Sequence, residues 1–235
     1  MKLEIPYQDL RSWIDLAGEV GELRGVEGAS WQEEIGMASE LLNRRDPAPA
    51  VIFDKIPGYP DGHRVLVNFF GGRRKNMTLG LPSGLNNVQM SEAFTKAFQE
   101  AKPIPYEFVD DGPILENVKM GDEVNVLQFP SPQWHELDGG RYIGTGSYNI
   151  TRDPDEDWIN LGTYRVMIHG KDRLGLYISP GKDGRIQMEK SFARNEPFPV
   201  AICFGQDPLL IYIASFHLPW GTSEYDYAGW VKGEP

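Results

Sequence analysis

Three polar side chains of this sequence have the types and spacing of a small catalytic site. Asn160 and Arg165 lie five residues apart in DWINLGTYR, and Glu224 follows far downstream in TSEY. Amide and carboxylate oxygens suit Mg²⁺ or Mn²⁺, and an Arg side chain pairs with carboxylates. On an uninterrupted strand, residues 160 and 165 point to opposite faces, so one shared site requires a bulge or turn between them. Spacing alone leaves capping groups and a surface ion pair as the ordinary interpretation.

Two segments together resemble the UbiD family of reversible decarboxylases. The family has an Asn-x-x-x-x-Arg pattern on a barrel strand, which Asn160 and Arg165 match. Its later Pro-x-Gly-x-x-Glu-x-x-x-x-Gly segment is matched by Pro219, Gly221, Glu224 and Gly229. The resemblance covers most of the chain. It implies that Asn160 and Glu224 bind Mn²⁺ or Mg²⁺, with K⁺ as a further candidate, and that catalytic Arg165 lies beside the substrate carboxylate.

At the position of the family's third metal ligand, this chain departs from the family pattern. Some members have Pro-Gly-Lys-His-Gly after the Arg strand, whereas residues 179–185 read SPGKDGR, without a His. Asp183 could supply an oxygen ligand in its place, which a hard cation accepts. Lys182 could instead place its ammonium against a cofactor phosphate. A turn without either role is equally open, because Pro-Gly and Asp-Gly are common turn dipeptides.

The cofactor implied by the resemblance is prenylated FMN. The implied reaction is non-oxidative decarboxylation of an aromatic or α,β-unsaturated carboxylic acid, with the flavin receiving the electrons released as carbon dioxide leaves. A lone His beside apolar residues is more often structural, which is the alternative for His217. The candidate cofactor-binding residues are Thr163, Tyr164, Arg165, Lys182, Ser215, Phe216 and His217.

The chain is shorter than the members of the family that it resembles. Its members are about twice as long, and their proton-donating acid belongs to a glutamate pair several dozen residues beyond the metal-binding Glu. The resemblance therefore implies an N-terminal fragment or one half of a split enzyme, completed by a C-terminal half or companion subunit and forming a homo-oligomer when complete. The alternative is a non-catalytic subunit that binds cofactor or acts as a scaffold. The small-molecule partner would be a carboxylic acid.

Composition limits the remaining partners. The chain has 235 residues, a formal charge of −11 and a pI near 4.9, so nucleic-acid backbones and anionic membranes repel it. No signal pattern and no apolar run of about 20 residues is present, and we expect a cytoplasmic protein. The single cysteine, Cys203, cannot form an internal disulfide and is expected to pack in a buried strand.

The pattern of apolar residues predicts an α+β fold: an N-terminal α/β domain over 1–110, followed over 111–235 by part of a split β-barrel, which the resemblance identifies as flavin-binding. Apolar spacing in the first domain predicts helices and short strands. Ser30 and Glu33 fit a capping box at the start of the second helix. The predicted helices cover about 7–18, 31–43 and 91–102, and the predicted strands cover 50–53 and 64–67.

The second part has the texture of a β-meander, with short apolar runs separated by turn-rich connectors. Two helices are expected after it, and Asp207 caps the second of them with Pro208 at its first position. The predicted strands cover 124–127, 148–151, 161–168 and 174–178, and the predicted helices cover 185–194 and 207–212.

Overall fold

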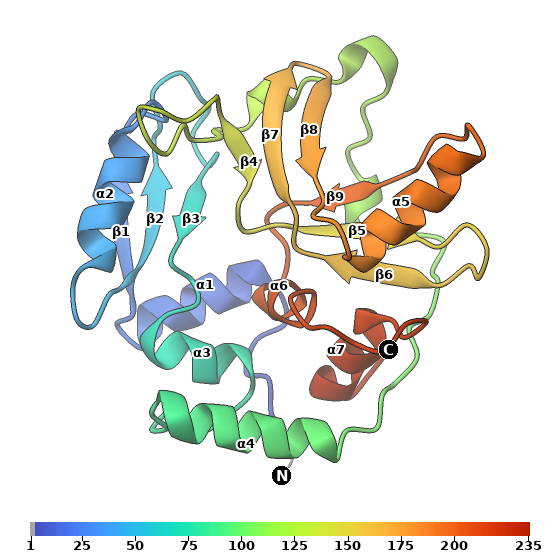
Figure 1. Ribbon diagram of the computed structural model, residues 1–235. Coiled ribbons are helices and arrows are strands. Elements are labelled where there is room, and N and C mark those ends of the chain that lie inside the picture. The colour runs from blue at the N-terminus through green and yellow to red at the C-terminus, as the bar shows by residue number, and fades with distance from the viewer. Residues whose placement is uncertain (1–2) are drawn as a thin grey trace.

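The computed structural model describes residues 3–235 and has an α+β architecture in which two groups of strands lie side by side (Figure 1). The N-terminal sheet has the order β1-β2-β3, with β1 parallel and β3 antiparallel to β2. Its strands are β1 (Leu23–Glu27), β2 (Ala50–Asp54) and β3 (Val65–Val67). The helices of this part are α1 (Leu10–Glu19), α2 (Glu34–Asn43), α3 (Gly72–Thr78) and α4 (Asn87–Gln99).

The N-terminal helices begin at caps that the sequence only partly predicts. The capping box of Ser30 and Glu33 is wrong, because Glu33 has a φ of 65° and makes no side-chain cap. Instead the Glu34 carboxylate accepts from the Ser30 N–H at 2.7 Å, and α2 begins at Glu34. Helix α4 begins before residue 91 because Asn86 caps it, in a capping box with Gln89.

The second part contains two three-stranded sheets. One has the order β4-β7-β8 and the other has the order β6-β5-β9, so both are open at their edges. Their strands are β4 (Tyr142–Gly144), β5 (Tyr148–Arg152), β6 (Ile159–Gly162), β7 (Arg165–Gly170), β8 (Arg173–Tyr177) and β9 (Ala201–Cys203). The helices are α5 (Asp183–Ala193), α6 (Pro208–Ile213) and α7 (Glu224–Lys232), and short 3₁₀ turns are η1 (Pro113–Leu115), η2 (Gly121–Glu123) and η3 (Val126–Gln128).

The single strand predicted over 161–168 is wrong, because the chain leaves one sheet and enters the other at Thr163 and Tyr164. The Tyr164 ring folds back over Gly162, where an added Cβ would lie 2.2 Å from the ring Cζ. Strand β6 therefore pairs with β5, and β7 pairs with β4 and β8, in place of one meander. The break supplies the turn that the spacing of Asn160 and Arg165 requires.

The strand predicted over 124–127 is also wrong. The Asn125 side chain accepts from the Leu127 N–H at 3.1 Å, a local bond that starts the turn η3 and competes with strand pairing. The helices predicted over 185–194 and 207–212 are confirmed as α5 and α6, and Asp207 caps α6 through the Leu209 N–H. Cys203 lies on β9 and is half-buried.

A shared core joins the two parts of the chain. Leu79 and Phe94 from the first part pack in one cluster with Leu209, Ile213 and Val231 from the second. On another side, the Arg141 guanidinium carbon lies 4.1 Å from the centre of the Trp31 ring, which connects the residue before β4 to the loop before α2. The domain boundary near residue 110 stays a prediction. No helix within residues 3–235 has the length and apolar character to cross a bilayer.

Candidate metal and substrate site

Three residues predicted as metal ligands come together where β6 meets the starts of two helices. Asn160 lies on β6, and Asp183 and Glu224 are the first residues of α5 and α7. Glu224 Oε2 accepts from the N–H of Leu161, the neighbour of Asn160, at 2.7 Å. Asp183 is close enough to Glu224 to raise its pKa by repulsion. The fold therefore collects an amide and two carboxylates from three separate elements.

The local sequence explains how each side chain is held. Asn160 is buried, and its amide nitrogen donates to Thr151 Oγ1 at 2.9 Å across the β5–β6 pair, which leaves its carbonyl oxygen as the atom able to bind a cation. The Ser223 hydroxyl caps α7 by accepting from the Tyr225 N–H. Both carboxylates stand in first turns, where free N–H groups and the helix dipole favour negative charge.

Charge at this site is not balanced by the described residues. Glu224 is 2% exposed, and burial, followed by repulsion from Asp183 and Asp226, raises its pKa to about 7 against the opposing Leu161 N–H. No ion pair to Glu224 or Asp183 occurs within residues 3–235. Two carboxylates and an amide oxygen that lack a cation have the donor chemistry of a divalent-metal site.

The donor set is small. Among residues 3–235 no group of three or more His, Cys, Asp and Glu side chains could hold a metal ion. The site therefore reaches three protein donors only by including the Asn160 amide oxygen, and it contains no imidazole. Such an all-oxygen set suits Mg²⁺ or Mn²⁺ better than a metal that prefers nitrogen or sulfur ligands.

Tyr164 connects the metal-ligand candidates to the start of α5. Its hydroxyl accepts from the Gly184 N–H at 3.3 Å, and the Asn160 side chain also hydrogen-bonds to it. Burial raises the pKa of this hydroxyl, which stays protonated at neutral pH. An added Cβ at Gly184 would lie 2.7 Å from the hydroxyl oxygen, so both Gly162 and Gly184 make room for the ring. Sequence reasoning missed this connection, because Gly184 lies 20 residues after Tyr164 and only the fold brings them together.

Thr163 in the break and Arg165 at the start of β7 line a hollow on the protein surface. This hollow has a volume of about 560 Å³, and Trp134, His135 and Tyr142 line its other side. The Arg165 guanidinium carbon is 5.9 Å from the centre of the Tyr142 ring. The structure thus places Arg165 at an accessible surface, next in sequence to the buried Tyr164.

The other predicted cofactor-binding residues lie in different surroundings. Lys182 is exposed at the start of α5. The Ser215 hydroxyl donates to the Tyr212 carbonyl at 2.6 Å, and His217 is exposed. The Phe216 ring packs against Phe98 at 5.4 Å between centres, within the aromatic core of α4, α6 and α7. Cofactor contact by these residues stays a prediction.

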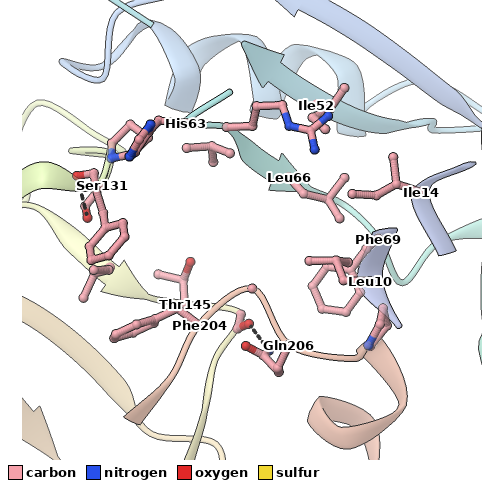
Figure 2. Close-up of a pocket in the computed structure, with 18 of the residues that line it drawn as sticks. Leu10, Ile14, Ile52, His63, Leu66, Phe69, Ser131, Thr145, Phe204 and Gln206 are labelled. Carbon is pink, nitrogen blue, oxygen red and sulfur yellow. Dashed lines mark hydrogen bonds between the residues drawn. The ribbon is translucent and has the colours of Figure 1, made fainter. Parts of the chain in front are cut away.

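A larger cavity, compared with the hollow beside Arg165, lies between the N-terminal part and the strands of the second part. It has a volume of about 780 Å³, and its walls are mostly apolar, with Leu66 and Phe69 facing Phe204 across the opening (Figure 2). His63 stands at its rim. None of the predicted site residues lines it. Cavity volume alone therefore does not identify the region that contains the predicted site residues.

Both parts of the chain match known sequence profiles. Residues 14–97 match the 3-octaprenyl-4-hydroxybenzoate carboxy-lyase N-terminal domain, and residues 107–235 match the Rift-related domain of the same enzymes, UbiD. The chain belongs to the UbiD family. The predicted family and the α+β fold are thereby confirmed.

Similar curated proteins are decarboxylases of aromatic acids. The chain is 30% identical over 233 residues to the phenolic acid decarboxylase of Sedimentibacter hydroxybenzoicus, covering 95% of this chain and 48% of the relative. It is 32% identical to the pyrrole-2-carboxylic acid decarboxylase of Pseudomonas aeruginosa, covering 97% of this chain and 47% of that protein. The chain spans about half the length of the curated relatives it matches.

Solved structures agree with this membership. The closed form of the Sedimentibacter hydroxybenzoicus vanillic acid decarboxylase has a TM-score of 0.85 and 28% identity, covering 97% of this chain and 49% of that one. A UbiD-class enzyme of Pelotomaculum thermopropionicum in complex with prFMN has a TM-score of 0.82 at 24% identity, covering 97% and 51%. The second likeness shows the shared fold.

Proposed function

We propose that this chain forms the metal- and cofactor-binding half of a decarboxylase that removes the carboxyl group of an aromatic or α,β-unsaturated acid. The observation that carries the proposal is the buried Glu224 carboxylate, which lies beside Asn160 and Asp183 with no cationic side chain paired to it within residues 3–235. Family membership, relatives named as aromatic-acid decarboxylases, and a prFMN-bound relative support the choice of reaction and cofactor.

The proposed metal site consists of the Asn160 amide oxygen and the carboxylates of Asp183 and Glu224. A Mn²⁺ or Mg²⁺ ion would neutralise two like charges, one of them buried, and would lower the pKa of Glu224 toward its ordinary range. Asp183 stands where some family members have His, so this site would bind through oxygen alone. The K⁺ site and the homo-oligomer rest on the family resemblance.

Arg165 is the proposed substrate-carboxylate residue. It lies on the exposed wall of the 560 Å³ hollow, beside the Tyr142 ring, where an acid from solvent can reach it. Its planar fork can donate two parallel N–H bonds to one carboxylate and so fix the direction of the carbon–carbon bond that breaks. Thr163 and Lys182 are the residues proposed to contact the cofactor from the two sides of Tyr164.

Prenylated FMN, when bound, supplies the electron sink for the departing carbon dioxide. The chain's own contribution is to orient the acid through Arg165 and to hold its position relative to the metal through the hydrogen bond between Asn160 and Tyr164, the neighbour of Arg165. Replacing carbon dioxide by a proton requires a positioned acid. We propose that this acid comes from a polypeptide corresponding to the second half of the relatives, as a continuation of this chain or a companion subunit.

The test uses the 235-residue chain, reconstituted anaerobically with prenylated FMN and Mn²⁺ and assayed with a panel of aromatic and acrylic acids. We expect Mn²⁺-dependent cofactor retention but no carbon dioxide release and no solvent-deuterium exchange until the second polypeptide is added. The Glu224→Gln variant is the matched control and should lose retention. Retention that ignores Mn²⁺ would refute the metal site. Retention without turnover, even with the second polypeptide, would favour the non-catalytic binding subunit.

A further inference from the structure

A group of charged and aromatic side chains connects the three elements that carry the candidate metal ligands. We call it the 156–190–220 clamp, after Glu156 in the β5–β6 turn, Lys190 on α5 and Trp220 in the loop before α7. In Figure 1, α5 lies against the β5–β6 hairpin, and contacts between α5 and both strands agree with this view. The clamp is separate from the donor atoms of the site.

Lys190 is the centre of the clamp. Its ammonium lies 2.8 Å from the buried carboxylate of Asp153 and 3.8 Å from that of Glu156, both in the β5–β6 turn. It also lies 4.9 Å from the centre of the Trp220 ring, within cation–π range. One side chain of α5 thus touches both of the other segments.

Trp220 closes the connection between the turn and the loop before α7. Its indole N–H donates to both oxygens of Glu156, at 3.0 and 3.1 Å. Its ring meets Trp158 edge to face, with centres 5.0 Å apart and an interplanar angle of 75°. Each segment of the clamp is therefore bonded to the other two.

The clamp residues lie close in sequence to the candidate metal ligands. Trp158 stands two residues before Asn160 at the start of β6, and Trp220 stands four residues before Glu224. Lys190 lies on the same helix that begins with Asp183. A cation site requires its ligands within tenths of an ångström, yet here they come from three elements and two of them repel each other.

We propose that Glu156, Lys190 and Trp220 are positioning residues that set the mutual placement of Asn160, Asp183 and Glu224 for cation binding. This inference rests on the proposed function. Exposed ion pairs without a positioning role contribute little to stability and do not affect metal binding. The two roles differ in what they affect: a positioning role weakens metal binding about 10- to 100-fold when lost, with the fold intact.

The experiment compares Mn²⁺ affinities of the 235-residue chain by electron paramagnetic resonance of the free aqua ion. Glu156→Ala should weaken binding about tenfold. Glu189→Ala is the matched control, because Glu189 is an exposed glutamate of α5 in an ion pair with Arg185 and lies outside the clamp. It should bind as the wild type does. Circular dichroism and thermal unfolding of each variant show whether the fold is retained.

Two further variants keep the test informative if one substitution disturbs folding. Trp220→Phe retains a ring for Lys190 but removes the N–H that Glu156 accepts, so it should bind less tightly than wild type and more tightly than Trp220→Leu. Lys190→Arg keeps the charge and should retain most of the affinity. Wild-type binding that is lost in Glu224→Gln but unchanged in Glu156→Ala and Trp220→Leu would overturn the clamp alone. Absence of Mn²⁺ binding by wild type would overturn the proposed metal site and the clamp together.

Discussion

Arg74 in the N-terminal part and Glu224 in the second part are both buried charged side chains, but their surroundings differ. Arg74 is 0% exposed and bonds to the Glu22 carboxylate at 2.6 Å and to the carbonyls of Ala48 and Asn68 at 2.8 and 3.0 Å. Glu224 accepts from the Leu161 N–H and has a second carboxylate, Asp183, as its neighbour. Among residues 3–235, Arg74 has a side-chain partner of opposite charge and Glu224 has none.

The difference teaches how to separate a structural charge from a functional one. Burial is common to both residues and carries no information about role. Buried charges in proteins are paired or bind metals, so the absence of a cationic partner around Glu224 within residues 3–235 is the feature that indicates a ligand. The two sites predict opposite responses when each charge is removed.

Removing the paired charge should have the largest effect on stability. Arg74→Met leaves the Glu22 carboxylate and two carbonyls without their donor, and we expect a loss of about 3–5 kcal/mol in the free energy of unfolding. Urea denaturation measures this loss. Lys55→Met, which breaks the exposed pair with Glu27, should cost less than about 1 kcal/mol. Similar midpoints for the two variants would contradict a structural role for the Arg74 pair.

The unpaired charge should make stability depend on pH. The pKa of Glu224 is about 7 in the folded chain and 4.5 ordinarily, so the folded state binds the proton more tightly. Tighter proton binding by the folded state adds to the free energy of unfolding. This added stability is fully present below pH 4.5 and is lost as pH rises through 7, a change of about 3 kcal/mol. Denaturation of wild type and Glu224→Gln between pH 4.5 and 8 isolates the contribution, because the variant lacks the titrating group. If the free energy of unfolding changed with pH equally in both proteins, the raised pKa of Glu224 would be contradicted.

Neutralising Glu224 should separate stability from binding. At pH 8 without metal, Glu224→Gln removes a repelled, buried charge, so we expect unchanged or increased stability. Its Mn²⁺ affinity should fall at least tenfold, about 1.4 kcal/mol, because one charged ligand is lost. Isothermal titration with Mn²⁺ measures the affinity, and Glu189→Gln, at an exposed carboxylate paired with Arg185, is the control. Equal affinities for wild type and Glu224→Gln would show that the cation binds elsewhere.

Arg165 should show the smallest effect on stability. It is exposed and makes no ion pair within residues 3–235, so Arg165→Lys should change the free energy of unfolding by less than about 0.5 kcal/mol. In the complete enzyme the same substitution keeps the charge but loses the paired donors, and turnover should fall sharply. Steady-state kinetics with the panel of acids gives the result, and near-normal turnover would assign the carboxylate to another residue.

The sequence named the candidate site residues, but it did not predict how the fold brings them together. The family matches at Asn160 and Glu224, and the substitution of Asp183 for the family His, named three residues that the fold brings together. The break at Thr163 and Tyr164 was not predictable from periodicity, since β-branched and aromatic residues favour a continuous strand. It depends on how the Tyr164 ring packs over Gly162, which is a tertiary contact.

The fold was predicted with similar limits. Helices and strands with strong apolar spacing were found near their observed bounds, whereas local side-chain bonds set the exceptions. Asn86 starts α4 early, and Asn125 replaces a strand by the turn η3. The placement of Phe216 in the aromatic core could not be foreseen either, because its neighbours Phe94 and Phe98 come from a helix more than a hundred residues earlier.

The break between β6 and β7 places Asn160 and Arg165 in different sheets, so the surroundings of the two residues can be altered separately. Strand β6, with Asn160, pairs with β5, and Arg165 begins β7, which pairs with β4 and β8. Trp134, Tyr142 and Thr145 line the hollow beside Arg165, and the β6 contacts to Thr151 and Glu224 lie outside that lining. Under the proposed function, a directed-evolution library for new acids should therefore vary those three lining residues.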